Sequence, residues 1–249
     1  MCYEDIVDFW QKKNISNSDE LAYTLDSYSV HFAYNSGKIE NNEITYHDTR
    51  EIFDKNGVTS YTGSLKTLFE IQNSKIAYEK LLDAFDKKEI IDENFVKKIH
   101  KYLTKGTYDE RRYRLGERPG EYKHHDYVTG KYEVGASPSL VHEEMLELLD
   151  DINDLDTVNK DILKSAAYFH AKLENIHPFS DGNGRVGRLL MNYILLIHNY
   201  PPIIIFEEDK KKYYSALEEY DKNIDLKPLI NFLKEQSIKT WKNYIDRDK

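Results

Sequence analysis

Residues 177–188, with the sequence HPFSDGNGRVGR, bring together side chains suited to phosphate chemistry. His177 is the only side chain in this segment whose ordinary pKa suits a general base at neutral pH. Asp181 offers a hard oxygen ligand, and Mg²⁺ is commonly bound by one carboxylate together with nucleotide phosphates. Arg185 and Arg188 stand three residues apart and so reach the same side of a helical turn, where guanidinium groups bind phosphate well.

The turn inside this segment has the composition of an anion site. Gly182 and Gly184, with Asn183 between them, let the backbone approach a ligand closely. A helix that begins after such a turn favours an anion at its N-terminus. No Gly-Lys-Ser/Thr follows, which excludes a Walker A loop, and a helix precedes the turn, which excludes a Rossmann fingerprint. An ordinary turn before a solvated helix start is the alternative.

Helices are expected to position these residues, because apolar residues recur at helical spacing through most of the chain. The expected helices cover about 18–35, 46–54, 64–86, 93–104, 138–152, 158–176, 185–199, 209–222 and 226–245. Pro178 disfavours helical geometry at His177 and therefore ends the helix before the turn. The helix that follows is apolar on nearly every side and should lie at the centre of the protein. These features predict a mainly α fold.

One region departs from the helical pattern. Tyr127-Val128 and Tyr132-Glu133-Val134 flank the turn Thr129-Gly130-Lys131, which is typical of a short β-hairpin. Since a two-stranded hairpin is marginally stable alone, we expect it to lie on the helical body as a flap. A surface loop without a role is the alternative.

The segment 177–188 resembles the Fic family signature HxFx(D/E)GNGRxxR at every specified position. The similarity extends to Phe169-His170, to residues 189–192, to the flap and to residues 213–217. The resemblance implies the Fic fold, a helical bundle with a β-hairpin flap over the active site. It also implies a protein adenylyltransferase, which transfers AMP from ATP to a Ser, Thr or Tyr hydroxyl of a target protein.

The resemblance further implies a role for each residue of the motif. His177 is the expected base that takes the proton from the target hydroxyl, and Asp181 is the expected ligand of Mg²⁺ across the α- and β-phosphates. Arg185 and Arg188 are expected to bind the β- and γ-phosphates. The other implied residues are the anion hole of Gly182, Asn183 and Gly184, the loop anchor Phe179 and a nucleoside contact, Asn192.

A second motif resembles the inhibitory motif (S/T)xxxE(G/N) of Fic proteins, with Ser36, Glu40 and Asn41 at its specified positions. Taken alone, this stretch looks like the polar end of a helix. The resemblance implies that Glu40 pairs with Arg188 and blocks the γ-phosphate position, as in the N-terminally autoinhibited (class II) members. A carboxylate can occupy the guanidinium fork that a phosphate needs.

The flap is the expected docking site for a target, through Lys123, His124, His125, Asp126, Tyr127 and Val128. Its backbone is expected to pair with the target segment by β-augmentation. Lys123 stands where family flaps often carry arginine. His124 and His125 point to opposite faces of a strand, so we expect surface residues rather than metal ligands.

Several alternatives stay open. Doc-type kinases carry lysine where Gly184 stands, so this glycine favours nucleotidyl transfer over phosphate transfer. Transfer of phosphate, UMP, GMP or phosphocholine, or removal of AMP, is compatible with the fold. A non-catalytic module is disfavoured because His177 and both arginines are present. A helical metalloprotein would use His170, His177 and Asp181, but a hydrogen-bonded core position is favoured for His170.

Composition limits the partners. The chain has 249 residues and a formal net charge of -9 at pH 7, which disfavours a non-specific nucleic-acid binder. Cys2 is the only cysteine, which excludes an internal disulfide and suits a reducing, cytoplasmic environment. We expect no signal peptide at the start of the chain and no membrane span in residues 189–206, the most apolar stretch, because polar residues and prolines interrupt it.

We expect one mainly helical unit with two parts. Residues 1–110 should form an N-terminal helical region with the inhibitory helix, and residues 111–249 the Fic catalytic core. The expected partners are ATP, a target protein and the chain itself, with Mg²⁺ as cofactor. Self-association into a homo-oligomer is compatible with the sequence.

Overall fold

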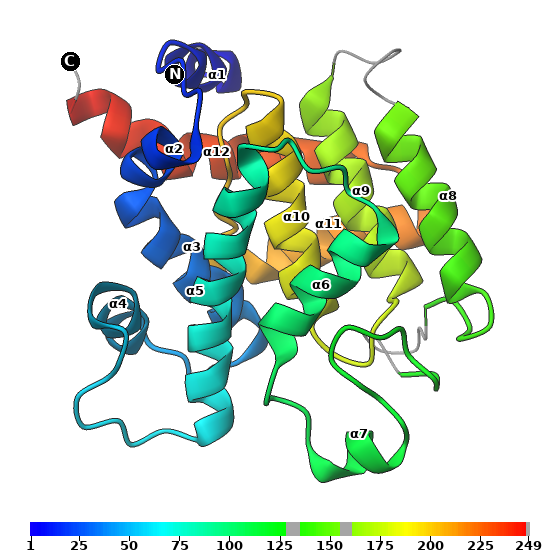
Figure 1. Cartoon of the computed structure of the whole chain (residues 1–249). Helices are drawn as coiled ribbons and strands as arrows, with labels where there is room; N and C mark the ends of the chain where they lie inside the picture. Colours follow the sequence, from blue (N-terminus) through cyan, green and yellow to red (C-terminus); the bar gives the residue numbers. More distant parts are fainter. Residues whose placement is uncertain (128–134, 155–160, 248–249) are drawn as a thin grey trace.

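The computed structural model describes residues 1–127, 135–154 and 161–247, and the chain it shows is mainly helical (Figure 1). None of these described residues forms a strand. The prediction of a mainly α fold is confirmed. The elements are α1 (Tyr3–Gln11), α2 (Ser18–Thr24), α3 (Asp26–Glu40), α4 (Tyr46–Lys55), α5 (Leu65–Phe85), α6 (Glu93–Thr104), α7 (Glu110–Arg114), α8 (Val141–Asp154), α9 (Ile162–Ile176), α10 (Asn183–Ile197), the 3₁₀ helix η2 (Glu207–Asp209), α11 (Lys210–Asn223) and α12 (Lys227–Arg247).

Most helix boundaries lie close to the expected ones, because side-chain caps mark them. Ser64 accepts a hydrogen bond from the Thr67 amide at the start of α5, and Asp92 caps α6 in the same way. The expected helix over 18–35 divides at Leu25 into α2 and α3, and α3 continues to Glu40. The short helices α1 and α7 were not expected from the apolar pattern.

Helix α10 lies at the centre of the molecule, as its apolar composition predicts. Nearly every residue from Asn183 to Leu196 is buried. Helix α9 packs along one side of α10, and α5 and α6 pack on another (Figure 1). Because the start of α10 carries the chemistry-bearing motif, these three neighbours form its walls.

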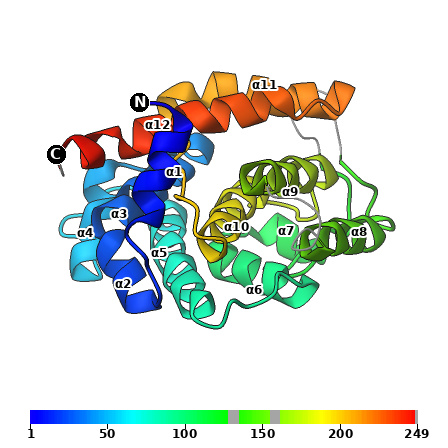
Figure 2. The same cartoon turned by 90° about the horizontal axis from the view of Figure 1, so that it is seen from above.

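The first and last helices close the same core. The rings of Trp10 in α1 and Trp241 in α12 have centroids 5.1 Å apart, and Tyr28 of α3 stacks on Trp241 at 5.8 Å. Helix α12 runs beside both α1 and α11 (Figure 2). The two predicted parts, 1–110 and 111–249, therefore contribute to one hydrophobic core. The boundary between them stays a prediction.

The expected β-hairpin falls mostly on residues 128–134, Val128 included, which lie outside the described residues. Its described flanks, up to Tyr127 and from Gly135, approach the end of α9. Among the described residues, no helix combines the length and the apolar character that a membrane span requires.

Candidate functional site

The end of α9 places His177 where the sequence predicts. The helix stops at Ile176, and His177 follows in the left-handed conformation with φ of 51°. Its N–H still donates to the Leu173 carbonyl at 2.9 Å, so His177 caps the helix while its side chain leaves the helical face. Pro178 enforces this end, because it disfavours helical geometry in the residue before it.

The turn that follows is held closed from inside. The Asn183 side chain donates to the Phe179 carbonyl at 2.8 Å and accepts from the Phe179 N–H at 2.9 Å. The buried Asn183 side chain therefore holds the loop closed, which leaves the backbone N–H of this residue for the expected anion site. Gly182, with φ of 87°, caps α10 in a conformation that favours glycine. The first turn of α10 leaves N–H groups without acceptors inside the helix, as an anion cradle requires.

His100 of α6 packs against this turn. This role was not predicted from the sequence. Its ring stacks on Phe179 with centroids 3.7 Å apart. Nε2 lies 2.9 Å from the Asp181 carbonyl oxygen, and Nδ1 accepts the Gly120 N–H at 2.8 Å. Burial lowers the pKa of His100 to about 3, so the ring is neutral with its proton on Nε2. A lone histidine on an amphipathic helix offers no sequence signal for such a role.

Arg188 is buried and fully engaged. Its Nη2 lies 2.7 Å from Glu40 Oε1 and 2.9 Å from the Ser36 carbonyl oxygen. Nε donates to the Ser36 hydroxyl at 3.0 Å, and Nη1 donates to the Tyr213 hydroxyl at 3.3 Å. The structure thus brings Ser36 and Glu40 of the second motif onto Arg188, across about 150 positions of sequence.

Gly184 lies directly against this contact. A Cβ atom at Gly184 would come 2.8 Å from Arg188 Nη1 and 3.1 Å from Glu174 Oε1, and closer still to Glu40. A larger residue therefore cannot stand there without displacing Glu40. Glu174 of α9 is a second carboxylate in this place that sequence reasoning missed. Burial, followed by the Glu40 charge, raises the pKa of Glu174 to about 8, so it is protonated at neutral pH.

Asp181 stands between two arginines. Oδ1 lies 3.3 Å from Arg185 Nη2, and Oδ2 lies 3.6 Å from Nη2 of Arg112 in α7. Burial acts to raise the pKa of Asp181, but the Arg185 and Arg112 charges outweigh it and hold the pKa below its ordinary value. Asp181 is therefore an ionised carboxylate. Arg112 was not expected in the site, because the sequence places it in a loop about 70 positions away.

The two described ends of the flap segment bracket His177. The Lys123 N–H donates to the Pro178 carbonyl, and the Ala136 N–H donates to the Ile176 carbonyl, both at 2.9 Å. Burial, with the Lys123 ammonium, lowers the pKa of His177 to about 4, although Asp181 and Glu40 act in the opposite direction. His177 is therefore neutral at pH 7 and able to accept a proton.

The flap residues divide into buried and exposed ones. Lys123 is only 2% exposed, so its side chain is not part of the exposed surface of the flap, and its expected part in docking a target stays a prediction. His124, His125 and Asp126 are exposed, as expected for a docking surface. The buried carboxylate of Glu117 organises them, with Oε1 near three donors: the His124 N–H at 3.0 Å, His125 Nδ1 at 3.2 Å and the Tyr127 hydroxyl at 2.8 Å.

Two further residues lie apart from the cradle. Asn192 donates to the Ile203 carbonyl at 2.9 Å and accepts the Ile203 N–H at 2.7 Å, so its amide fixes the backbone that follows α10; its expected contact with a nucleoside stays a prediction. His170 Nε2 lies 2.7 Å from the Tyr213 hydroxyl, which supports the favoured core position. In the part of the chain that is described, no group of three or more His, Cys, Asp or Glu side chains could hold a metal ion.

Several proteins named as protein adenylyltransferases are similar in sequence to this chain. A family model described as Fic/DOC family matches residues 90–195. Protein adenylyltransferase fic-1 of Caenorhabditis elegans is 37% identical over 109 residues, covering 44% of this chain and 21% of that protein. Protein adenylyltransferase Fic of Drosophila willistoni is 30% identical over 226 residues, covering 88% of this chain and 42% of that protein. The chain thus spans less than half the length of these relatives.

The likeness includes the fold. The crystal structure of a Fic domain containing signaling protein from Bacteroides thetaiotaomicron superposes with a TM-score of 0.82 at 28% identity. The match covers 96% of this chain and 93% of that chain. It therefore includes the N-terminal helices as well as the turn before α10, and the predicted helical Fic fold is confirmed, while the expected hairpin lies mostly outside the described residues.

Proposed function

Because this chain carries a Fic/DOC family domain in residues 90–195, we propose that it transfers AMP from ATP to a hydroxyl of a target protein, and that Glu40 restrains this transfer. The target is a Ser, Thr or Tyr residue, of this chain itself or of another protein. The observation that carries the proposal is the convergence of a neutral histidine, an ionised aspartate and two buried arginines at one turn.

His177 acts as the base. The target oxygen attacks the α-phosphorus of ATP, the bond from that phosphorus to the bridging oxygen breaks, and pyrophosphate leaves. His177 takes the proton of the hydroxyl. The flap flanks support this role, because their hydrogen bonds to Pro178 and Ile176 hold the described ends of the flap segment on either side of His177, where the proposed target segment would dock.

Asp181 is the residue that fits a Mg²⁺ ion. Its carboxylate is ionised and about a quarter exposed, so it can offer oxygen to an ion that also binds nucleotide phosphates. Bound Mg²⁺ supplies charge neutralisation to the triphosphate. Arg112 and Arg185, which flank Asp181, add positive charge at the same place and favour the polyphosphate over a neutral ligand.

Arg185 and Arg188 bind the β- and γ-phosphates, and Glu40 competes for the second of them. A carboxylate at 2.7 Å from Nη2 occupies the donor that a γ-phosphate oxygen needs. Glu40 is about a third exposed, whereas Arg188 is buried, so the glutamate is the partner that can withdraw. Autoinhibition of this kind lowers the fraction of ATP that is bound productively and leaves His177 in place as the base.

The test is labelling of the purified chain with α-labelled and γ-labelled ATP in the presence of Mg²⁺. We expect label from α-labelled ATP only, at least about tenfold more in Glu40→Gly than in the parent, and none in His177→Ala. Glu43→Gln is the matched control, because this nearby glutamate contacts Thr67 and not Arg188. Label from γ-labelled ATP alone would identify a kinase instead, and equal labelling of Glu40→Gly and parent would refute restraint by Glu40.

A further inference from the structure

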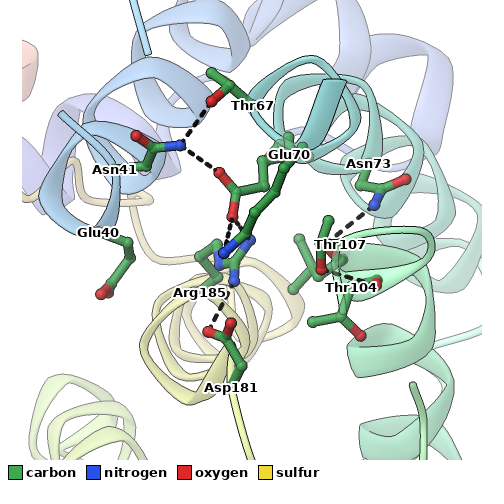
Figure 3. Close-up of polar contacts among 12 residues, drawn as sticks. Glu40, Asn41, Thr67, Glu70, Asn73, Thr104, Thr107, Asp181 and Arg185 are labelled. Atoms are coloured by element: carbon green, nitrogen blue, oxygen red, sulfur yellow. Dashed lines mark hydrogen bonds and ion pairs between the residues drawn. The ribbon is translucent and has the colours of Figure 1, made fainter. Parts of the chain in front are cut away.

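Asn41, the last residue of the inhibitory motif, turns away from Arg188 and toward α5. Asn41 Nδ2 donates to Glu70 Oε2 at 2.7 Å and to Thr67 Oγ1 at 2.9 Å (Figure 3). Its Oδ1 accepts the Glu43 N–H at 2.9 Å, which fixes the orientation of the amide. Asn41 therefore delivers both N–H groups to α5, while the adjacent Glu40 reaches α10.

Glu70 carries this contact on to the cradle. The side chain is only 5% exposed, and its Oε1 lies 3.5 Å from Arg185 Nη1 (Figure 3). Lys66 Nζ lies 3.8 Å from the same oxygen. A buried carboxylate is costly unless it is paired, so the position of Glu70 depends on Asn41 and on these two cations.

Arg185 is held by two carboxylates, and within the described part of the chain not all of its nitrogens make hydrogen bonds. It lies between two carboxylates, Glu70 and Asp181, at 3.5 and 3.3 Å. Among the described residues, its buried Nε and Nη1 have no hydrogen-bond partner. Arg188 differs, because each of its nitrogens donates to Ser36, Glu40 or Tyr213. All the nitrogens of Arg188 therefore donate hydrogen bonds, whereas Nε and Nη1 of Arg185 donate none to the residues that the structure describes.

We propose that Glu70 is a positioning residue of the nucleotide site, which holds Arg185 in reach of the β-phosphate and is itself held by Asn41. This inference rests on the proposed function, in which Arg185 binds that phosphate. Two neighbouring residues of one motif then act on the two arginines in different ways: Glu40 occupies Arg188, and Asn41 orients Arg185 through Glu70.

The geometry favours positioning over blocking. At 3.5 Å without a hydrogen bond, Glu70 does not occupy the donors of Arg185 as Glu40 occupies those of Arg188. Without the Glu70 charge, Asp181 is the one close carboxylate left to Arg185 among the described residues. The guanidinium would then shift toward Asp181, away from the phosphate and onto the expected metal ligand.

The test compares ADP with AMP, because only ADP has a β-phosphate. Binding of each nucleotide with Mg²⁺ is measured by titration calorimetry in the Glu40→Gly chain, with and without Glu70→Gln. We expect Glu70→Gln to raise the Kd for ADP about tenfold and to leave the Kd for AMP within about twofold. Asn41→Ala should also raise the Kd for ADP relative to the Kd for AMP, but by a smaller factor. Glu79→Gln, an exposed change on the same helix, should alter neither.

A double variant separates positioning from general damage. In an Arg185→Gln background, Glu70→Gln should have no further effect on ADP binding, because its action passes through Arg185. An equal loss for ADP and AMP, an effect that persists without Arg185, or no effect on ADP would each overturn the inference. If Glu40→Gly binds neither ADP nor ATP, the proposed function fails first and the role of Glu70 falls with it.

Discussion

At the scale of single residues, burial of the Arg188 guanidinium destabilises the fold unless its neighbours pair with it. A guanidinium taken out of water is destabilising unless its donors are paired. Ser36, Glu40 and Tyr213 together provide that pairing. The inhibitory motif is therefore also part of the folded core, and changes in it should alter stability as well as activity.

Ser36→Ala tests this coupling. The change removes the hydroxyl that accepts from Arg188 Nε and leaves that N–H buried without a partner, so we expect the free energy of unfolding to fall by about 1–3 kcal/mol. Urea unfolding followed by circular dichroism measures it. Ser29→Ala on the same helix is the control, because its hydroxyl donates only to the neutral Asp26 carbonyl. Equal losses in both variants would show that the contact between Ser36 and Arg188 contributes no more to the free energy of unfolding than an ordinary hydroxyl hydrogen bond.

The motif residues could be predicted from sequence, but most of their partners could not. Local rules correctly placed the end of α9 before His177, and family resemblance paired Glu40 with Arg188. Glu70 and Arg112 carry no signal of their own, since a glutamate on a helix and an arginine in an expected loop are usually solvated. Tertiary packing alone brings them to Asp181 and Arg185.

At the scale of elements, α6 supports the turn of residues 177–182 that precedes α10. His100 and Thr104, one helical turn apart, both face the turn before α10. The end of α6 is fixed in turn by Asn73 of α5, which donates to the Leu103 and Lys105 carbonyls. The apolar pattern predicted both helices, but it could not predict which face of α6 would meet the motif.

Gly182→Ala tests the fit between α6 and the turn. A Cβ at Gly182 would lie 2.7 Å from the Thr104 methyl carbon, at a backbone φ of 87°. We expect a loss of about 2–4 kcal/mol in the free energy of unfolding, from the clash together with the strain of the left-handed conformation. Adding Thr104→Ser removes the methyl and keeps the hydroxyl that donates to the His100 carbonyl, so it should restore part of the loss. The same loss with and without Thr104→Ser would place the strain elsewhere.

At the scale of the whole molecule, the walls around α10 enclose titratable groups. Burial lowers the pKa of His100 and His170 to about 3 and that of His177 to about 4, and it raises that of Glu174 to about 8. Each shift links folding to pH. The three histidines bind protons near pH 6.5 only when the chain is unfolded, so they favour unfolding as pH falls below that value. Glu174 acts in the opposite direction, because the folded chain keeps its proton up to about pH 8.

The balance predicts greatest stability near neutral pH. Around pH 5.5 these four groups together give the unfolded chain about two more bound protons than the folded chain, so their contribution to stability should fall by about 2–3 kcal/mol per pH unit on acidification. Above pH 7 only the Glu174 contribution remains, and stability should fall gently toward pH 8. Urea midpoints at pH 5, 6, 7 and 8 measure both slopes. Glu174→Gln should abolish the loss of stability between pH 7 and pH 8. The control His47→Gln, at an exposed residue, should leave that loss unchanged. A parent chain that is equally stable at pH 5 and pH 7 would contradict the neutral burial of the three histidines.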